Sequence, residues 1–432
     1  MNVRRAAYNI LSESERSKKY ISLALDSYIS SNGVVGEDRA LLSALVYGVT
    51  ERRITLDYFI EVFSGRSISA LDKEVVHLLR LGAYQIIYLD KIPDSAAVNE
   101  SVKLASRYAS RSKNFINAIL RRICREKEAL PYPSDPIERI SIENSLPIAL
   151  CEHFKRDYPD EWVDIVKASN SRPHITLAVN TLKTSRDALA EIIGKGCEKT
   201  VFSDKGLRLT SNFAVSELSP LNEGLCYVQD EASQIAVSSL SPKAGETIID
   251  VCSCPGGKAF FAAISMENKG KIYCFDLHES KLSLIKNQAK NLGINILEIS
   301  PNDSRFAKEE LVGKADRVIC DVPCSGLGVI AKKPEIRHKD IGSLGELDGI
   351  QKDILEASAK YVKAGGVLLY STCTLRKAEN EGRVLDFLKD HSDFKLTPFK
   401  LGELCADSGM VTLIPQKQKT DGFFISLMTK IS

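Results

Sequence analysis

Short apolar runs alternate with helical patterns in the second half of this chain, from about residue 226 onward. Runs rich in Val, Ile, Leu and aromatic residues stand at 247–252, 271–276, 317–321 and 366–371, and such runs are typical of buried strands. Residues 280–292, between two of them, have the spacing of a helix. Strands that are joined through helices pair in parallel by right-handed crossovers. Residues 226–432 are therefore predicted to form a largely parallel, doubly wound α/β sheet.

The first 128 residues carry a purely helical pattern. Apolar residues recur at i, i+3, i+4 and i+7 in the segments 40–49, 75–84, 96–109 and 115–120. Three prolines within residues 131–136 then interrupt the pattern and mark a linker. Residues 1–128 therefore predict an all-α bundle that forms a domain of its own.

Residues 129–225 combine both kinds of pattern. A strand-like run stands at 174–180, and residues 184–187 (Thr-Ser-Arg-Asp) offer a capping box for a helix over 188–193. We expect a small α+β domain here, between the bundle and the sheet. It contains no catalytic constellation, so it serves either as a spacer or docking module or as a contact for the substrate.

Composition excludes several classes of protein. The chain has 432 residues, of which 44% are hydrophobic and 26% charged, so it is neither disordered nor collagenous, and two or three domains are expected. No apolar run approaches the roughly 18 residues that a membrane helix needs. The eleven cysteines are an odd number in a chain whose start lacks a signal-peptide pattern, so we expect reduced thiols in a cytoplasmic protein.

The overall charge is nearly balanced, but its distribution is not. There are 58 Lys and Arg against 56 Asp and Glu, a net charge of +2. Residues 101–125 contain no acid, and their basic residues are Lys103, Arg107, Arg111, Lys113, Arg121, Arg122 and Arg125. Such a segment can contact the phosphates of a nucleic acid, or it can be the solvated face of an ordinary helix.

A glycine-containing loop follows the first strand of the predicted sheet. Residues 250–258 read Asp-Val-Cys-Ser-Cys-Pro-Gly-Gly-Lys and lead into a helix over 259–265, and Asp276 ends the next strand. Glycines let a ligand approach the backbone, and an acid after the second strand suits ribose hydroxyls. The loop lacks the G-x-G-x-x-G pattern and contains a rigid proline, which disfavours a dinucleotide. S-adenosylmethionine fits better; the alternative is an ordinary Pro-Gly turn.

Two cysteines follow later strands of the same sheet. Cys324 lies in Asp321-Val322-Pro323-Cys324-Ser325-Gly326, and Cys373 lies in 370–374 (Tyr-Ser-Thr-Cys-Thr). Open α/β sheets bind ligands at the carboxyl ends of their strands, so both thiols can face one pocket. They could form a metal pair, a redox pair, or a nucleophile with a helper. No nearby C-x-x-C or H-x-H motif supplies further metal ligands. Packing is the default for the other nine: Cys124, Cys151, Cys197, Cys226, Cys252, Cys254, Cys274, Cys320 and Cys405.

The order of these motifs resembles that of the RNA 5-methylcytosine methyltransferases. In chain order, the motifs are residues 250–258, Asp276, Asp303, residues 321–326 and residues 371–373. Asn380-Glu381 resembles the family's later acidic motif, and 229–234 resembles the segment before its first strand. Residues 1–128 resemble the NusB-like RNA-binding domain. The combination resembles the RsmB (Sun/Fmu) branch, which methylates bacterial small-subunit rRNA, and covers essentially the whole chain.

This resemblance implies a Rossmann-like methyltransferase domain at 226–432, with 16S ribosomal RNA as substrate and C5 of a cytosine as methyl acceptor. Attack of a thiolate at C6 would make C5 nucleophilic, which is covalent catalysis. By resemblance, Cys373 is the nucleophile and Cys324 assists release of the product. Asp321 would hold the cytosine near N3, and Lys258 would polarise the base or orient the site. The base must leave its stack, so single-stranded or loop RNA is expected.

The resemblance also implies the residues that hold S-adenosylmethionine. Asp276 would bind the ribose, Asp303 would lie near the adenine, and Asp321 would border the cofactor. The remaining members of this set are Cys252, Ser253, Cys254, Pro255, Gly256, Gly257 and Lys258.

The chain departs from the family pattern at two positions, Cys254, where alanine is usual, and Ala259, where a hydroxyl residue is usual. Both changes are small. Residues 332–338 fit the family's RNA-facing insertion, or else form a solvated charged loop. Asp303 could instead be an ordinary turn residue.

Two other functions stay open. The same chemistry could act on tRNA, or the protein could be a NusB-like RNA-binding or antitermination factor with a vestigial cofactor domain. Whichever function holds, we expect no metal, no membrane association and a monomer.

Overall fold

A computed structural model of the chain describes residues 2–17, 21–210, 218–339 and 341–431. The chain forms two compact units. The first consists of residues 1–170 together with 330–339, and the second consists of residues 171–329 together with 340–432. Within the described ranges, no helix combines the length and apolar character needed to cross a membrane.

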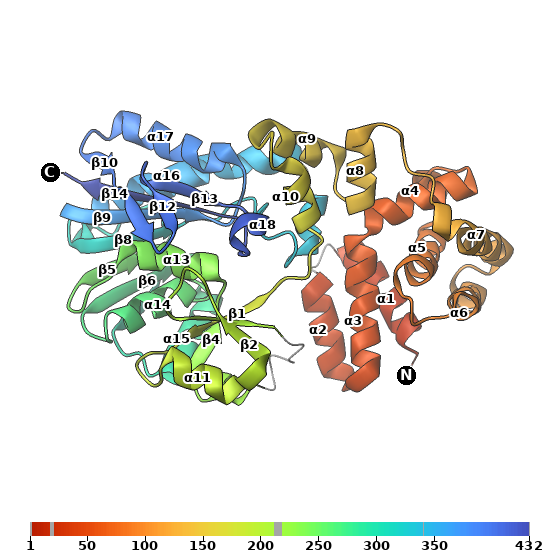
Figure 1. Cartoon of the computed structure of the whole chain (residues 1–432), viewed down its shortest axis with the longest axis horizontal. Helices are drawn as coiled ribbons and strands as arrows, with labels where there is room; N and C mark the ends of the chain where they lie inside the picture. The colour runs from red at the N-terminus through yellow and green to blue at the C-terminus, as the bar shows by residue number, and fades with distance from the viewer. Residues whose placement is uncertain (1, 18–20, 211–217, 340, 432) are drawn as a thin grey trace. The chain divides into compact units, whose positions relative to one another are not determined.

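The first unit is helical throughout (Figure 1). Its amino-terminal helices are α1 (Val3–Ser17), α2 (Ile21–Asn32), α3 (Gly36–Glu51), α4 (Arg53–Ser64), α5 (Lys73–Tyr88), α6 (Asp94–Tyr108) and α7 (Lys113–Glu126). The predicted all-α bundle is confirmed. Helix α5 lies at its centre, and its Gly82 leaves room for the side chain of Leu120 from α7, because a Cβ there would lie 2.6 Å from a Leu120 methyl.

Three further helices, α8 (Pro136–Asn144), α9 (Ile148–Asp157) and α10 (Trp162–Ala168), follow the proline-rich linker. They belong to the first compact unit, which ends at Asn170. The division of the chain into 1–128, 129–225 and 226–432 stays a prediction, and the compact units divide it at residue 170 instead.

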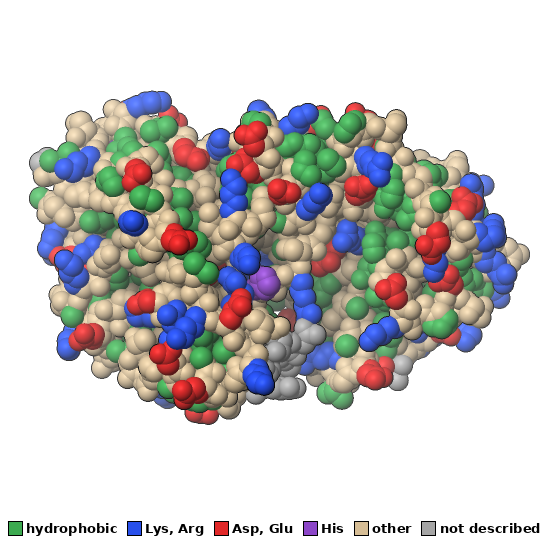
Figure 2. Space-filling model, viewed as in Figure 1, with side chains coloured by type: hydrophobic (Ala, Val, Ile, Leu, Met, Phe, Trp, Pro, Cys, Tyr) green, Lys and Arg blue, Asp and Glu red, His purple; other side chains and the backbone are tan. Residues whose placement is uncertain are grey.

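Basic side chains gather along α6 and α7 in the space-filling view (Figure 2). Some of them are neutralised locally: Lys103 pairs with Glu100 at 2.6 Å, and Arg122 pairs with Glu126 at 2.9 Å. The segment 101–125 is therefore less positive than its sequence indicates, because both acids lie just outside it.

Residues 330–339 form part of the helical unit, although the chain reaches them through the loop that follows Cys324. Arg337 is 1% exposed, and its guanidinium donates to the carbonyls of Glu51, Ser145 and Ser169 at 2.7, 3.3 and 3.1 Å. It also donates to Oδ1 of Asn170 at 3.0 Å. The expectation that 332–338 is RNA-facing or a solvated loop is therefore wrong for Arg337, which satisfies carbonyl groups at the ends of helices.

The second unit begins with a small antiparallel sheet of order β2-β3-β1-β4. Its strands are β1 (Ile175–Val179), β2 (Cys197–Lys199), β3 (Gly206–Leu209) and β4 (Cys226–Val228), and α11 (Arg186–Ile193) follows β1. Leu177, Leu189 and Leu207 share one core. The predicted small α+β domain is confirmed.

The large sheet has the order β10-β14-β9-β8-β5-β6-β7, with β13 paired to β14. The strands are β5 (Thr247–Asp250), β6 (Lys271–Asp276), β7 (Leu297–Pro301), β8 (Ala315–Asp321), β9 (Val362–Thr372), β10 (Phe394–Leu396), β13 (Met410–Leu413) and β14 (Phe423–Lys430). Strands β5 to β9 pair in parallel, whereas β14 pairs antiparallel with β9, β10 and β13. The sheet is therefore mixed, because the chain after β9 returns to its edge by antiparallel pairing.

Helices cover both faces of this sheet, as a doubly wound fold requires. Helices α13 (Glu231–Leu240), α14 (Gly257–Ser265) and α15 (Glu279–Leu292) contribute to one core. Helices α16 (Glu346–Tyr361) and α17 (Glu381–Asp390) contribute to the other. Figure 1 shows the two groups of helices on opposite sides of the strands. The Rossmann-like fold is confirmed.

Replacing Arg337 by Met is expected to lower the free energy of unfolding by about 3 kcal/mol, because a buried acceptor that loses its donor costs about 1–3 kcal/mol. Urea unfolding followed by circular dichroism measures the change. The matched control is Lys333→Met, four residues earlier at an exposed position. Equal stability of the two variants would contradict the role given to Arg337.

Candidate active site

Two thiols lie together at the carboxyl ends of neighbouring strands. β8 and β9 pair in parallel, and their last paired residues are Asp321 and Ser371. Cys324 lies in the loop after β8, and Cys373 directly follows β9. Their sulfur atoms are 3.3 Å apart. Both cysteines therefore belong to a single site.

Cys324 is the protonated thiol of this pair at neutral pH. Its hydrogen bond with Cys373, together with burial, raises the pKa of the Cys324 thiol well above its ordinary value. The carboxylates of Glu379 and Asp321 act in the same direction. Since the thiolate is the nucleophilic form of cysteine, Cys324 is suited to hold a proton rather than to attack.

A buried carboxylate fixes the loop that carries Cys324. Glu379 is fully buried, and its Oε2 accepts the backbone N–H of Ser325 at 2.9 Å and Nε2 of Gln351 at 2.7 Å. The hydroxyls of Ser325 and Thr374 are 2.7 Å apart, which joins the two cysteine loops directly. Sequence reasoning missed Glu379 and Gln351, because nothing in their sequence context shows that the fold brings them to this loop.

An ion pair between Lys258 and Asp321 lies beside the thiols. Lys258 Nζ donates to Oδ2 of Asp321 at 2.6 Å, and the hydroxyl of Ser371 donates to Oδ1 at 2.7 Å. The ammonium also lies 5.3 Å from the centre of the Phe423 ring. Burial by itself would lower the pKa of Lys258, but the carboxylates of Asp321 and Asp250 raise it above its ordinary value. Lys258 therefore stays a cation at neutral pH.

A cavity of about 200 Å³ adjoins this pair. Residues singled out from the sequence line it: Asp250, Cys252, Ser253, Cys254, Pro255, Gly257, Lys258 and Asp321. Val228, Gln229, Asp230 and Ser233 complete the lining, and sequence reasoning did not place them in the site. The sequence does contain a signal for Gln229, Asp230 and Ser233, because they belong to the segment 229–234, which precedes the first strand of the large sheet.

Gly256 is the N-cap of α14, between Pro255 and Gly257, which line this cavity. Its φ of 108° lies in the left-handed region, and a Cβ there would overlap the ring of Phe260. Gly257, the first residue of the helix, lines the cavity itself, and a Cβ there would lie 3.2 Å from Nε2 of Gln229. The two glycines therefore let the helix begin close to the space that a ligand would occupy.

Asp276 and Asp303 are not among the side chains that line this cavity. Asp276 ends β6, and its Oδ1 accepts the backbone N–H of His278 at 3.0 Å. Asp303 forms an ion pair with Arg305 at 2.6 Å, which lowers the pKa of its carboxyl group. The roles of both residues in binding the cofactor stay predictions.

Asp250 is buried with little hydrogen bonding. It is 1% exposed at the end of β5, and within the described residues neither carboxylate oxygen makes a hydrogen bond of ordinary geometry, although Ser253 and the backbone of Cys252 lie close enough to lower its pKa. Burial, opposed by Lys258 and reinforced by Asp321, raises its pKa to about 7. A buried polar group without partners is costly, so Asp250 is suited to a ligand that donates to it.

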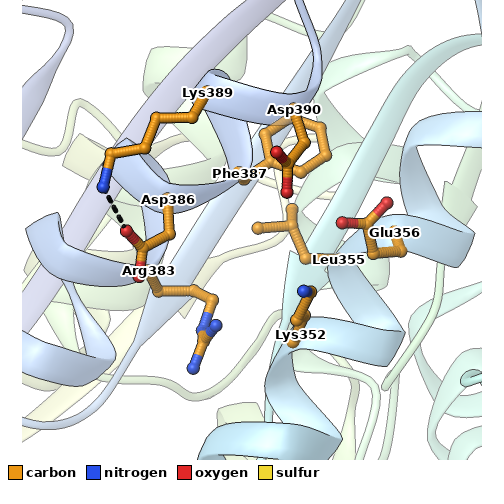
Figure 3. A pocket seen from close by; sticks show the side chains of 8 residues that line it. All are labelled: Lys352, Leu355, Glu356, Arg383, Asp386, Phe387, Lys389 and Asp390. Atoms are coloured by element: carbon orange, nitrogen blue, oxygen red, sulfur yellow. Dashed lines mark hydrogen bonds and ion pairs between the residues drawn. The ribbon is translucent and has the colours of Figure 1, made fainter.

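Another cavity of about 190 Å³ lies between α16 and α17 (Figure 3). It is lined by charges of both signs, including Lys352, Arg383 and Asp386. None of its lining residues belongs to the thiol site, so it is a separate hollow. No group of three or more His, Cys, Asp or Glu in the described ranges is placed to hold a metal ion.

Known families match the chain in three consecutive segments. The NusB family matches residues 1–125, a ferredoxin-like domain of RsmF/B-like methyltransferases matches 146–216, and the family described as 16S rRNA methyltransferase RsmB/F matches 237–429. A probable ribosomal RNA small subunit methyltransferase B from Bacillus subtilis is 35% identical over 99% of both chains. The corresponding protein from Synechocystis is 35% identical over the full length of both.

The chain belongs to the ribosomal RNA small subunit methyltransferase B family. Its fold agrees with solved structures. The crystal structure of PH0851 covers 99% of this chain and 98% of its own, with 30% identity and a TM-score of 0.81. A methyltransferase homologue from Pyrococcus horikoshii matches 69% of this chain and all of its own, with 26% identity and a TM-score of 0.61.

The raised pKa of Asp250 predicts a pH dependence of stability in this methyltransferase. The folded protein keeps the proton of Asp250 up to about pH 7, whereas the unfolded chain loses it near pH 4. This contribution to stability is therefore complete below pH 4 and is lost as the pH rises through 7. Relative to Asp250→Asn, the wild-type protein should lose up to about 4 kcal/mol of unfolding free energy over this interval.

Urea unfolding of both proteins at several pH values between about 5 and 8 measures this difference. The matched control is Asp204→Asn, whose side chain is 75% exposed and should leave the slope unchanged. A difference between wild type and Asp250→Asn that does not vary with pH would show that Asp250 is already ionised.

Proposed function

We propose that this protein is an S-adenosylmethionine-dependent methyltransferase that modifies C5 of a cytosine in small-subunit ribosomal RNA. The observation that carries the proposal is the pair of thiols 3.3 Å apart beside the Lys258–Asp321 ion pair. A redox pair would not need the adjoining ionic pair and cavity, and further ligands for a metal pair are absent from the described residues. A nucleophile with a helper accounts for all of these features.

The cavity beside the thiols fits S-adenosylmethionine. Asp250 presents unpartnered carboxylate oxygens to it, which suit the positively charged amino group of this cofactor. Gly257 lets α14 begin without a side chain in the way, and Gln229 and Asp230 add polar groups. When bound, the cofactor supplies an electrophilic methyl group on a sulfonium centre. Asp276 would hold the ribose, and Asp303 would lie near the adenine.

The thiol pair performs the covalent part of the mechanism. The Cys373 thiolate adds to C6 of the cytosine, the electrons of the C5–C6 bond move towards N3, and C5 becomes nucleophilic. After methylation, a water molecule accepts the proton from C5, and the re-forming C5–C6 double bond expels the thiolate of Cys373. Cys324 is placed to serve this release, because its sulfur touches that of Cys373.

Asp321 and Lys258 position the base. Asp321 is held from two sides by Lys258 and Ser371, so its carboxylate has one orientation in which to contact the cytosine near N3. The Lys258 cation stabilises electron density that moves towards N3 during attack. The cytosine must leave its stack to reach these groups, which favours a loop or single strand of RNA.

The relatives of this chain favour ribosomal RNA over tRNA as the substrate. They match it over 99% or more of its length and bear the name ribosomal RNA small subunit methyltransferase B. The NusB-like helices provide a basic segment for RNA, along α6 and α7. A vestigial domain is disfavoured by the intact Cys324, Cys373 and Asp321, which still form one connected site.

Incubation with methyl-labelled S-adenosylmethionine and unmodified 16S rRNA tests the proposal. Label should enter 5-methylcytosine, identified by nucleoside mass spectrometry. An equal amount of unmodified tRNA is the matched substrate. Label in tRNA alone would reassign the substrate, and label on an atom other than cytosine C5 would refute the chemistry.

Replacement of each cysteine by alanine is predicted to block a different step of the reaction. Cys373→Ala should lose methyl transfer by at least about 10³-fold, since removal of a nucleophile abolishes covalent catalysis. Cys324→Ala should form the adduct and release it slowly, so a protein–RNA complex should survive denaturing electrophoresis. Cys320→Ala, a buried cysteine on β8 outside the site, is the matched control. An active Cys373→Ala protein would overturn the assignment.

A further inference from the structure

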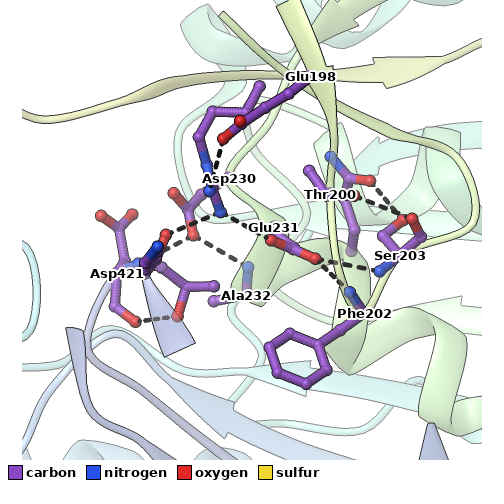
Figure 4. A network of polar contacts seen from close by, with 12 residues as sticks. Glu198, Thr200, Phe202, Ser203, Asp230, Glu231, Ala232 and Asp421 are labelled. Carbon is purple, nitrogen blue, oxygen red and sulfur yellow. Dashed lines mark hydrogen bonds and ion pairs between the residues drawn. The ribbon is translucent and has the colours of Figure 1, made fainter. Parts of the chain in front are cut away.

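A buried ion pair joins the small antiparallel sheet to the helix that precedes the large sheet. Arg208 on β3 is 5% exposed, and Glu231, the first residue of α13, is 1% exposed. Nη2 of Arg208 donates to Oε2 of Glu231 at 3.2 Å. Oε1 of Glu231 accepts the backbone N–H groups of Phe202 and Ser203 at 2.6 and 3.1 Å (Figure 4). Buried charges are tolerated when they are bonded in this way, and they then allow few alternative arrangements.

The same arginine reaches a turn near the carboxyl end of the chain. Nη2 of Arg208 also donates to the carbonyl of Lys419 at 3.1 Å. Two residues later, the backbone N–H of Asp421 donates to Oδ1 of Asp230 at 3.1 Å. That oxygen also caps α13 by accepting the N–H of Ala232 at 2.9 Å. The turn formed by residues 419–422 is therefore held at Lys419 by Arg208 and at Asp421 by Asp230, the residue before Glu231.

The 419–422 turn contacts the thiol site. The N–H of Gly422 donates to the carbonyl of Gly328 at 2.9 Å, and the N–H of Gly328 donates to the carbonyl of Cys373 at 3.0 Å. The two glycine backbones are in direct contact, since a Cβ on Gly422 would lie 2.7 Å from Cα of Gly328. A shift of the turn therefore has to move the backbone beside Cys373.

We propose that Arg208 is a positioning residue for Cys373, which it acts on through the 419–422 turn and Gly328. The small α+β domain thereby takes part in organising the active site. A misplacement of about 1 Å between reacting groups can cost about 100-fold in rate, so a network of this kind has a measurable effect on turnover. The turnover measurement rests on the proposed function, whereas the reactivity of the Cys373 thiol does not.

Arg208→Lys tests this inference in the full-length protein. Lysine keeps the charge next to Glu231 but lacks the planar fork that bonds several acceptors at once. The rate at which iodoacetamide alkylates Cys373, followed by peptide mass spectrometry without RNA or cofactor, should change several-fold. With RNA, kcat should fall about 10- to 100-fold, and KM for S-adenosylmethionine and RNA should stay unchanged.

Lys199→Gln is the matched control, because it removes only the exposed pair with Asp187 on the same sheet. It should behave as wild type in both measurements. Gly422→Ala changes the 419–422 turn where it contacts Gly328, and it should reproduce the change in the alkylation of Cys373. The inference can therefore be tested even if Arg208→Lys fails to fold.

Wild-type alkylation of Cys373 in folded Arg208→Lys and Gly422→Ala proteins would overturn the inference. A fall in kcat that only follows the folded fraction, measured by urea unfolding, would overturn it too. If the wild-type protein transfers no methyl group but these variants change the alkylation of Cys373, the proposed function fails and the positioning role stands.

Discussion

The parallel pairing of β8 with β9 is the constraint on which the site depends. Asp321 and Ser371 are the last paired residues of these strands, so the loops that carry Cys324 and Cys373 leave the sheet side by side. A thiol contact at 3.3 Å follows from this register. A slip of one residue would turn each side chain to the other face of the sheet, and the pair would be lost.

Two buried carboxylates near the thiols, Glu379 and Asp250, differ in their hydrogen bonding. Glu379 is fully buried, and its Oε2 accepts two hydrogen bonds that fix the Cys324 loop. Asp250 is equally buried but has no such partners, and its pKa is raised to about 7. The bonded carboxylate maintains the geometry of the protein, whereas the unpartnered one faces the cavity in which a ligand can complete its bonding.

Two buried arginines bond segments of the chain that are far apart in the sequence. Residues 330–339 follow the Cys324 loop, yet they complete the helical unit through the buried Arg337. Arg208 of the small sheet bonds the turn that contacts Gly328. Both arginines satisfy backbone carbonyls, which gives a long charged side chain a structural use inside the protein.

The sequence by itself determined the elements and the chemistry-bearing residues. The periodicity of apolar residues predicted the helices of the bundle and the parallel strands β5, β6, β8 and β9, because burial of one face imposes that spacing. The motifs also identified both cysteines, Lys258 and Asp321. Only the tertiary structure decided that β14 pairs antiparallel with β9, that Glu379 and Asp230 reach the site, and that Arg337 is buried. These are contacts between residues far apart in the chain, and local spacing carries no information about which distant partner satisfies a buried polar group.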